Sequence, residues 1–128
     1  MTIWSAPVRY AEVDQQGVVF NSHYLVWCDE ALAAFCAERG LQTFAEAVHL
    51  KASSLVWSAP ARWGQRVEVT VRCHSVGRTS TTLAFEIAAD GEPCCHVETV
   101  YVLAADGLPQ VIDDATRAAL TVGYAGNG

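Results

Sequence analysis

The sequence contains few charged residues, and positive charge is especially scarce. Only 17% of its 128 residues are charged, one residue is a lysine, and the net charge is -6 at pH 7. Nucleic acids and anionic membrane surfaces bind proteins through clustered Lys and Arg side chains, so this balance argues against both as partners. The sequence has no apolar run approaching the roughly 18 residues of a membrane helix, and no secretory signal pattern. We therefore expect a cytoplasmic protein that binds neither nucleic acid nor membrane.

Disulfide and metal-ligand patterns are also missing. The five cysteines form an odd set without a CxxC pair and lie within apolar stretches. Such positions are typical of reduced thiols in a hydrophobic core; they are Cys28, Cys36, Cys73, Cys94 and Cys95. His49, His74 and His96 lie in strand-like segments without zinc-ligand spacing, so we expect them to be structural. The sequence therefore predicts no disulfide framework, no metal site and no bound cofactor.

Apolar residues, by contrast, are abundant, at 52% of the chain. This composition excludes a disordered chain, and 128 residues suffice for one domain with a core but not for two. We expect a single domain over residues 1–128. So few charged residues leave little polar surface for a monomer, which favours burial of further surface between identical subunits. The expected assembly is a homodimer or a homotetramer.

The first half of the sequence predicts a strand, a loop and one apolar helix. Residues 2–10 are rich in strand-forming side chains, and no period continues through the loop that follows, up to residue 22. Residues 23–39 have helical composition, and Gly40 provides the expected left-handed stop. Charged side chains are so few on this helix that we expect it to be buried. Residues 41–48 predict a further short helical turn.

The second half changes to the two-residue period of β-strands. Alternation over residues 66–76 and 81–89 indicates half-buried strands, and further strands are expected at about 49–63 and 94–105. Short turns between consecutive strands predict an antiparallel meander, and residues 123–128 resemble a frayed tail. The predicted fold class is α+β, with a five-stranded antiparallel sheet wrapped around one long buried helix. The other face or edge of the sheet remains available to a second subunit.

The segment between the first strand and the helix carries the candidate chemistry. Asp14 and Gly17 lie shortly before the helix, and Asn21 and Ser22 are good N-cap residues. Unpaired N–H groups at a helix start can polarise a carbonyl oxygen, while a carboxylate can attack the carbonyl carbon or activate water. These groups suit hydrolysis of a thioester, whose thiolate leaves with little acid assistance. Without further context, however, an Asp in such a loop is more often a turn or cap residue.

The same segment resembles the 4-hydroxybenzoyl-CoA thioesterase family of hotdog-fold enzymes. The family motif combines a hydrophobic residue, an Asp, a Gly, two aliphatic residues and two aromatics, matched here by Val8, Asp14, Gly17, Val18, Val19, Phe20 and Tyr24. The resemblance continues through residues 59–64, 77–80 and 108–112 and covers nearly the whole chain. It implies the hotdog fold and hydrolysis of an acyl-CoA to a free acid and CoA, with acyl carrier protein as an alternative carrier.

The resemblance also implies roles for individual residues. Asp14 is expected to act as nucleophile or general base, and Tyr10 matches a tyrosine that assists in one subgroup. Asn21 stands where that subgroup often has His, and an amide can orient substrate or water but does not exchange protons at neutral pH. The residues expected to bind the substrate around the helix start are Gly17, Val18, Ser22, His23 and Tyr24.

Arginines provide the candidate contacts for the phosphates of CoA. Arg78 lies in a turn with Thr79 and Ser80, where a cation and two hydroxyls can bind phosphate. A solvated hairpin is an equally good interpretation of this turn. Arg62 is a weaker candidate for the same contact.

Two other functions are compatible with the fold. A hotdog hydratase or dehydratase needs a His facing a carboxylate across the subunit interface, and no typical hydratase motif is present. A non-hydrolytic acyl-CoA-binding or regulatory module would account for Val13 and Asn21, which differ from the usual family residues. Asp14 beside Gly17 favours hydrolysis over this module. His23 by itself is interpreted as a packing or capping residue.

Overall fold

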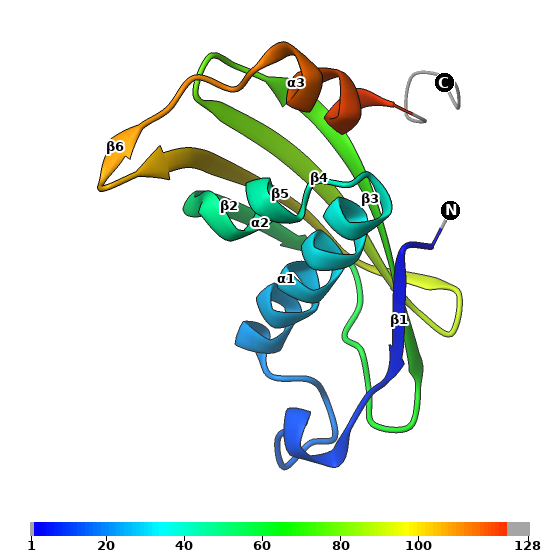
Figure 1. Ribbon diagram of the computed structural model, residues 1–128. Coiled ribbons are helices and arrows are strands. Elements are labelled where there is room, and N and C mark those ends of the chain that lie inside the picture. The colour runs from blue at the N-terminus through cyan, green and yellow to red at the C-terminus, as the bar shows by residue number, and fades with distance from the viewer. Residues whose placement is uncertain (1, 123–128) are drawn as a thin grey trace.

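One antiparallel sheet and one long helix organise the chain (Figure 1). The computed structural model describes residues 2–122, so the tail expected at 123–128 lies outside the described residues. The strands are β1 (Trp4–Pro7), β2 (Val48–Trp57), β3 (Arg66–Val76), β4 (Ser80–Ala89), β5 (Glu92–Ala105) and β6 (Leu108–Pro109). The helices are the short 3-10 helix η1 (Tyr10–Glu12), α1 (Asn21–Glu38), α2 (Gln42–Ala47) and α3 (Asp114–Thr121). The predicted α+β class with one long helix is confirmed.

The strand order is β1-β3-β4-β5-β2, with the short β6 beside β5, and all these pairings are antiparallel. Three consecutive strands, β3 to β5, form the predicted meander. The prediction is wrong for β2, because residues 58–65 carry the chain across the sheet and β2 pairs with β5 instead of β3. In the described part of the chain, β2 is therefore an edge strand whose outer backbone groups have no neighbouring strand.

The turn between β4 and β5 shows how the meander keeps its register. Asp90 and Gly91 have φ angles of 49° and 82°, as a two-residue turn with the twist of a β-hairpin requires. The Asp90 carboxylate accepts a hydrogen bond from the Arg66 N–H at 2.8 Å, which ties the turn to the start of β3. Val69 of β3 then lies opposite Ile87 of β4. Apolar side chains of neighbouring strands consequently share the inner face of the sheet.

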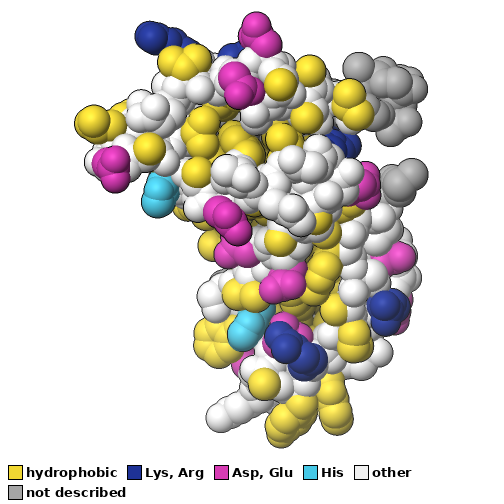
Figure 2. Space-filling model, in the orientation of Figure 1, with side chains coloured by type: hydrophobic (Ala, Val, Ile, Leu, Met, Phe, Trp, Pro, Cys, Tyr) yellow, Lys and Arg dark blue, Asp and Glu magenta, His cyan; other side chains and the backbone are white. Residues whose placement is uncertain are grey.

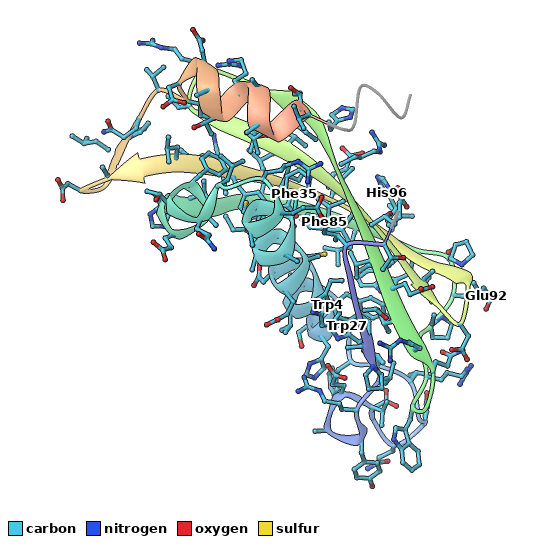
Figure 3. All side chains as sticks on the ribbon, turned by 45° about the vertical axis from the view of Figure 1, so that its right-hand side comes forward. Trp4, Trp27, Phe35, Phe85, Glu92 and His96 are labelled. Carbon is cyan, nitrogen blue, oxygen red and sulfur yellow. The ribbon has the colours of Figure 1, made fainter. Side chains whose placement is uncertain are left out.

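Helix α1 lies in the concave face of the curled sheet (Figure 1). Its buried residues recur every three or four positions and form one stripe: Tyr24, Trp27, Cys28, Ala31, Leu32, Phe35 and Cys36. The opposite side of the helix, including Val26, is exposed in the single chain, and hydrophobic side chains are visible on this face (Figure 2). Phe35 of α1 and Phe85 of β4 belong to the core between helix and sheet (Figure 3).

The structure describes all five cysteines, and each is buried as a free thiol, as predicted. Cys94 and Cys95 are adjacent and yet both buried, because the register between β4 and β5 shifts at this point. Burial raises the pKa of Cys28, and it raises those of Cys36 and Cys95 to about 11. These thiols therefore behave as core side chains.

Helix α3 has no counterpart among the predicted elements. Asp113 caps its start, since its carboxylate accepts a hydrogen bond from the Thr116 N–H at 2.7 Å. Arg117 donates to the carbonyl oxygens of Val76 and Gly77 at 3.1 and 3.0 Å. The helix therefore holds the turn between β3 and β4 in place.

Candidate active site

The loop at residues 13–19 holds Asp14 in a tight hairpin after η1. Val13 and Val19 pair across it as an isolated antiparallel bridge. The N–H of Asp14 donates to the Val18 carbonyl at 2.9 Å, and the N–H of Gly17 donates to the Asp14 carbonyl at 3.0 Å. Gly17 has a φ angle of 78°, which residues with a side chain rarely adopt. The motif glycine is therefore required by the turn that presents Asp14.

The half-buried carboxylate of Asp14 uses only one oxygen within this loop. Its Oδ1 accepts hydrogen bonds from the N–H groups of Gln16 at 2.8 Å and Val18 at 3.4 Å. Its Oδ2 accepts no hydrogen bond from residues 2–122. Asp14 also lines a surface depression of about 450 Å³ together with Tyr10 and Phe20. The turn role of Asp14 thus leaves one carboxylate oxygen for a ligand.

The segment between β2 and β3 packs against this loop. The N–H of Trp63 donates to the Gly17 carbonyl at 3.2 Å, and Val18 and Arg62 form an isolated antiparallel bridge. Three residues expected in the site, Gly17, Val18 and Arg62, are therefore brought together with Asp14 at one end of the molecule.

Helix α1 starts directly after the loop with its first N–H groups uncapped. Phe20 occupies the N-cap position, where no side-chain hydrogen bond forms in the described structure. The predicted capping by Asn21 and Ser22 is wrong, because both residues already lie in the first helical turn. The N–H of His23 donates to the Phe20 carbonyl at 3.0 Å. The N–H groups of Asn21 and Ser22 are consequently available to a ligand.

A second depression, of about 350 Å³, adjoins the helix start. It is lined by Val18, Val19, Asn21, Tyr24, Trp57, Ser58, Ala59 and Pro60. Tyr24 is almost fully buried, and its hydroxyl accepts a hydrogen bond from the Ala61 N–H at 2.9 Å. In the single chain, Asp14 and Asn21 therefore line two neighbouring depressions, with Tyr10 beside Asp14 and Tyr24 beside Asn21.

Aromatic side chains are exposed around the Asp14 loop. Tyr10 is 73% exposed, Phe20 60% and Trp63 59%. The rings of Tyr10 and Trp63 meet edge to face, with their centroids 5.2 Å apart. Figure 2 shows hydrophobic side chains projecting from the lower tip of the molecule, where Figure 1 places this loop. Large exposed apolar groups of this kind mark a surface for a ligand or another subunit.

The turn with Arg78, Thr79 and Ser80 lies at the opposite end of the sheet from the Asp14 loop (Figure 1). Strand β3 alone has 11 residues, which corresponds to roughly 35 Å at about 3.3 Å per residue. Arg78 is exposed, and its carbonyl accepts a hydrogen bond from the Ile112 N–H at 2.9 Å. Within one chain, the structure does not bring Arg78 and Asp14 together.

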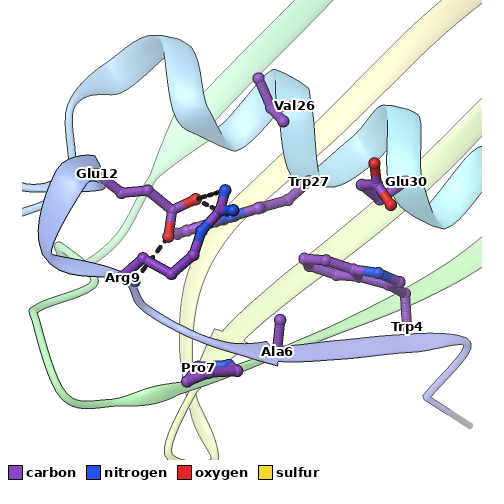
Figure 4. Close-up of a pocket in the computed structure, with 8 residues that line it drawn as sticks. All are labelled: Trp4, Ala6, Pro7, Arg9, Glu12, Val26, Trp27 and Glu30. Carbon is purple, nitrogen blue, oxygen red and sulfur yellow. Dashed lines mark hydrogen bonds and ion pairs between the residues drawn. The ribbon is translucent and has the colours of Figure 1, made fainter.

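Glu12 is a buried carboxylate beside the site that has no place among the predicted site residues. Only 2% of it is exposed, and it accepts hydrogen bonds from the Arg9 N–H at 2.8 Å, the Arg9 guanidinium at 3.1 Å and the Trp27 indole at 3.0 Å (Figure 4). Burial alone would raise the pKa of Glu12, but these hydrogen bonds outweigh it and lower that pKa. The three-residue spacing from Arg9 to Glu12 was the available sequence signal.

We expect Glu12 to make the folded state sensitive to acid. A carboxyl group with a lowered pKa stabilises the fold above its ordinary value of 4.5, and this stabilisation is lost as the pH falls through the folded-state pKa. The free energy of unfolding should therefore fall less between about pH 5 and pH 3 in Glu12→Gln than in the unmodified protein. Urea unfolding across this range measures both slopes, and parallel slopes would contradict the expectation.

Among residues 2–122, no helix is both long and apolar enough to cross a membrane. The same residues include no group of three or more His, Cys, Asp or Glu side chains arranged to hold a metal ion. His96 lies between Glu86 and Glu98, with one ring nitrogen hydrogen-bonded to each carboxylate. This arrangement agrees with the structural role expected for His96.

Solved structures with the same fold include several thioesterases. A thioesterase from Thermus thermophilus, complexed with coenzyme A and Zn, matches with a TM-score of 0.85 and 23% identity over 91% of this chain and 89% of that chain. A 1,4-dihydroxy-2-naphthoyl-CoA thioesterase from Synechocystis matches with a TM-score of 0.79 and 20% identity over 91% and 93%. A hypothetical protein, also from Thermus thermophilus, has 28% identity and a TM-score of 0.81 over 94% and 97%. These likenesses establish the fold.

Family membership follows from the sequence. No curated protein matches the chain significantly. Residues 8–120, however, match the model of the thioesterase-like superfamily, a range that includes the whole motif around Asp14. The narrower assignment to the 4-hydroxybenzoyl-CoA thioesterase branch stays a prediction. The chain therefore belongs to the thioesterase-like superfamily, and the predicted class of enzyme, a thioester hydrolase with the hotdog fold, is confirmed.

Proposed function

We propose that the protein hydrolyses an acyl-CoA thioester to a free acid and CoA, with Asp14 as nucleophile or general base. The observation that carries this proposal is the Asp14 carboxylate, since the loop binds one oxygen and no group within residues 2–122 binds the other. The uncapped N–H groups of Asn21 and Ser22 follow directly and suit a developing oxyanion. A carboxylate and such donors suffice, because a thiolate leaves without a strong acid.

Tyr10 and Asn21 are assigned assisting roles. Tyr10 lines the same depression as Asp14, and its exposed hydroxyl can hydrogen-bond to substrate or water. Asn21 lines the neighbouring depression, where its amide can orient the thioester but cannot transfer a proton. The proposed substrate contacts around the thioester are Gly17, Val18, Ser22, His23 and Tyr24.

Release of free thiol from a panel of acyl-CoAs tests this function. Aromatic, short aliphatic and long aliphatic thioesters are assayed side by side at equal concentration. Hydrolysis of at least one class is expected, and the preferred class identifies the acyl group. Binding of acyl-CoA without thiol release would support the non-hydrolytic module instead.

The open edge of β2 is the proposed contact between subunits. Strand β2 has ten residues, and Leu50, Val56 and Trp57 on it are exposed in the single chain. An open edge with apolar side chains readily pairs with another strand. A two-fold axis at this edge would pair two β2 strands antiparallel and continue the sheet across both subunits. The proposed assembly is a homodimer, or a homotetramer built from two such dimers.

This dimer would change where Arg78 lies relative to Asp14. A two-fold axis perpendicular to the sheet reverses the partner end to end, so the partner's turn at residues 78–80 moves to the end that carries Asp14. We place the CoA phosphates at Arg78 of the partner subunit, with Thr79 and Ser80 as hydroxyl donors and Arg62 as the rival within the same subunit. The substrate then lies between two subunits.

Arg78→Ala is expected to raise KM for acyl-CoA roughly tenfold while changing kcat little. The phosphates lie far from the bond that breaks, so this contact stabilises the bound substrate and the transition state equally. A pantetheine thioester without the nucleotide should be nearly insensitive to the substitution. Arg62→Ala is the matched variant: if it raises KM while Arg78→Ala does not, the phosphate site belongs to Arg62.

The remaining assignments follow from the sequence. Acyl-CoA is the proposed substrate, and acyl carrier protein is the alternative carrier of the same thioester. CoA is part of the substrate, so no separate cofactor is proposed. We assign the activity to a single domain over residues 1–128 and to the cytoplasm.

A further inference from the structure

A pocket of about 210 Å³ lies between β1, η1 and α1, with Glu12 and Trp27 in its wall (Figure 4). The Glu12 carboxylate faces the indole of Trp27 from the neighbouring element. We propose that Glu12 is a positioning residue whose buried carboxylate clamps the base of the Asp14 loop to α1. The clamp fixes Asp14 relative to the N-terminus of the helix. This inference rests on the proposed role of Asp14 in hydrolysis.

Three donors converge on the Glu12 carboxylate: two belong to Arg9, which precedes η1, and one belongs to Trp27 of α1. Its Oε1 accepts the Arg9 N–H, while its Oε2 accepts both the Arg9 guanidinium and the Trp27 indole N–H. The Arg9 side chain is 70% exposed, so solvent weakens the ion pair. The indole bond is buried and comes from a different element. It is therefore a buried side-chain contact that joins η1 to α1.

Glu12 stands at the base of the hairpin that carries Asp14. The Glu12 carbonyl accepts the N–H of Phe20, which follows the hairpin, at 2.9 Å. Val13 and Val19 pair next to this bond. Glu12 is joined to the first residue of the hairpin by the peptide bond and to the residue after it by this hydrogen bond. Because the hairpin is also bonded internally, a shift of Glu12 moves Asp14 with the whole loop.

Trp27 also supports the loop from its other side. Its ring meets Tyr24 edge to face, with the centroids 5.0 Å apart. The Tyr24 hydroxyl accepts the Ala61 N–H at 2.9 Å, and the Ala61 carbonyl accepts the Val19 N–H at 2.9 Å. The Glu12–Trp27 contact is thus one part of a closed set of buried contacts around the loop.

Glu12→Gln tests the clamp with little change of shape. Gln has one acceptor oxygen and an NH₂ group in place of two acceptor oxygens, so at least one donor from Arg9 or Trp27 would face another donor. We expect kcat to fall about tenfold with KM nearly unchanged, because the reacting carboxylate moves while other substrate contacts remain. Glu30→Gln is the matched control, since Glu30 lines the same pocket from an exposed position. Its kcat should stay within about twofold of the unmodified protein.

Two further variants distinguish positioning from a general loss of structure. Trp27→Phe removes the indole donor from the same contact, so it should lower kcat similarly and add little to Glu12→Gln. In an Asp14→Asn background, Glu12→Gln should not lower the residual activity further, because Glu12 acts through Asp14. A full additional loss in that background would overturn the proposal.

Amide hydrogen exchange at residues 13–20 provides a measurement that needs no turnover. Exchange in this segment should be at least about tenfold faster in Glu12→Gln, while exchange in β4 stays unchanged. If residues 13–20 exchange at the same rate in Glu12→Gln and in the unmodified protein, the clamp is refuted, whether or not the protein hydrolyses thioesters. Faster exchange combined with full turnover of Asp14→Asn would support the clamp and refute the catalytic role of Asp14.

Discussion

Asp14→Asn is expected to lower kcat for acyl-CoA hydrolysis by at least about a hundredfold while the fold stays intact. Asn has the shape of Asp and keeps an oxygen that can accept the Gln16 N–H bond now made by Oδ1. The turn should therefore survive. The amide, however, neither attacks a thioester carbonyl nor takes a proton from water. Thiol release at saturating acyl-CoA and thermal unfolding measure the two parts of this expectation.

Asn21→Ala is the matched comparison for this variant. Asn21 is exposed in the first turn of α1, where Ala is compatible with the helix. Its loss of kcat should be smaller than that of Asp14→Asn, because Asn21 orients groups without exchanging protons. If Asn21→Ala lowers kcat as much as Asp14→Asn does, Asn21 takes part directly in the chemical step. Near-normal turnover of a folded Asp14→Asn would exclude Asp14.

Leu50→Lys combined with Val56→Lys is expected to produce a monomer near 13.8 kDa and to lower kcat/KM for acyl-CoA by at least about a hundredfold. Both side chains are exposed on the open edge of β2. A two-fold axis would bring like charges together there, and Lys on an edge strand opposes strand pairing. Without the partner, the phosphate contact at Arg78 is absent and the site stays open to water. Light scattering and thiol release measure the two effects.

Leu108→Lys combined with Val111→Lys is the control for the β2 variant. These two residues are also exposed and apolar, but they lie in and after β6, which pairs with β5 and not with the open edge of β2. Their replacement should change neither the mass nor kcat at saturating acyl-CoA. If the unmodified protein already scatters as a monomer, the shared site is refuted. A monomer with full activity would refute it too.

Sequence periodicity predicts those helices and strands in which buried and exposed side chains alternate regularly. The two-residue period identified β3 over 66–76 without error, and Gly40 marked the end of the helix closely. The position of β2 depends on residues 58–65, which have no period, and on a long-range pairing with β5 that local patterns do not encode. Helix α3 was missed because it is short and buries little, although Asp113 was a readable cap signal.

The geometry of the candidate site was predictable where its residues are neighbours in sequence. Asp14, Gly17 and the helix start form one local unit, and the motif fixes their spacing. Glu12 was not identified because its partner Trp27 is 15 positions away and reads as an ordinary core residue. The position of Arg78 relative to Asp14 was not predictable either, because the length of β3 separates the two residues only once the chain is folded into the sheet.

Because its cysteines are buried, the folded protein should react very slowly with the thiol reagents that are used to measure thioester hydrolysis. Thiol reagents attack thiolates, and the pKa of about 11 for Cys36 and Cys95 leaves very little thiolate at neutral pH. The thiol of released CoA then reacts much faster than the protein thiols. The absorbance change of the reagent therefore measures hydrolysis with little contribution from the protein. Unfolding exposes all five cysteines to solvent at the same time, so the same reagent also measures the fraction of unfolded protein.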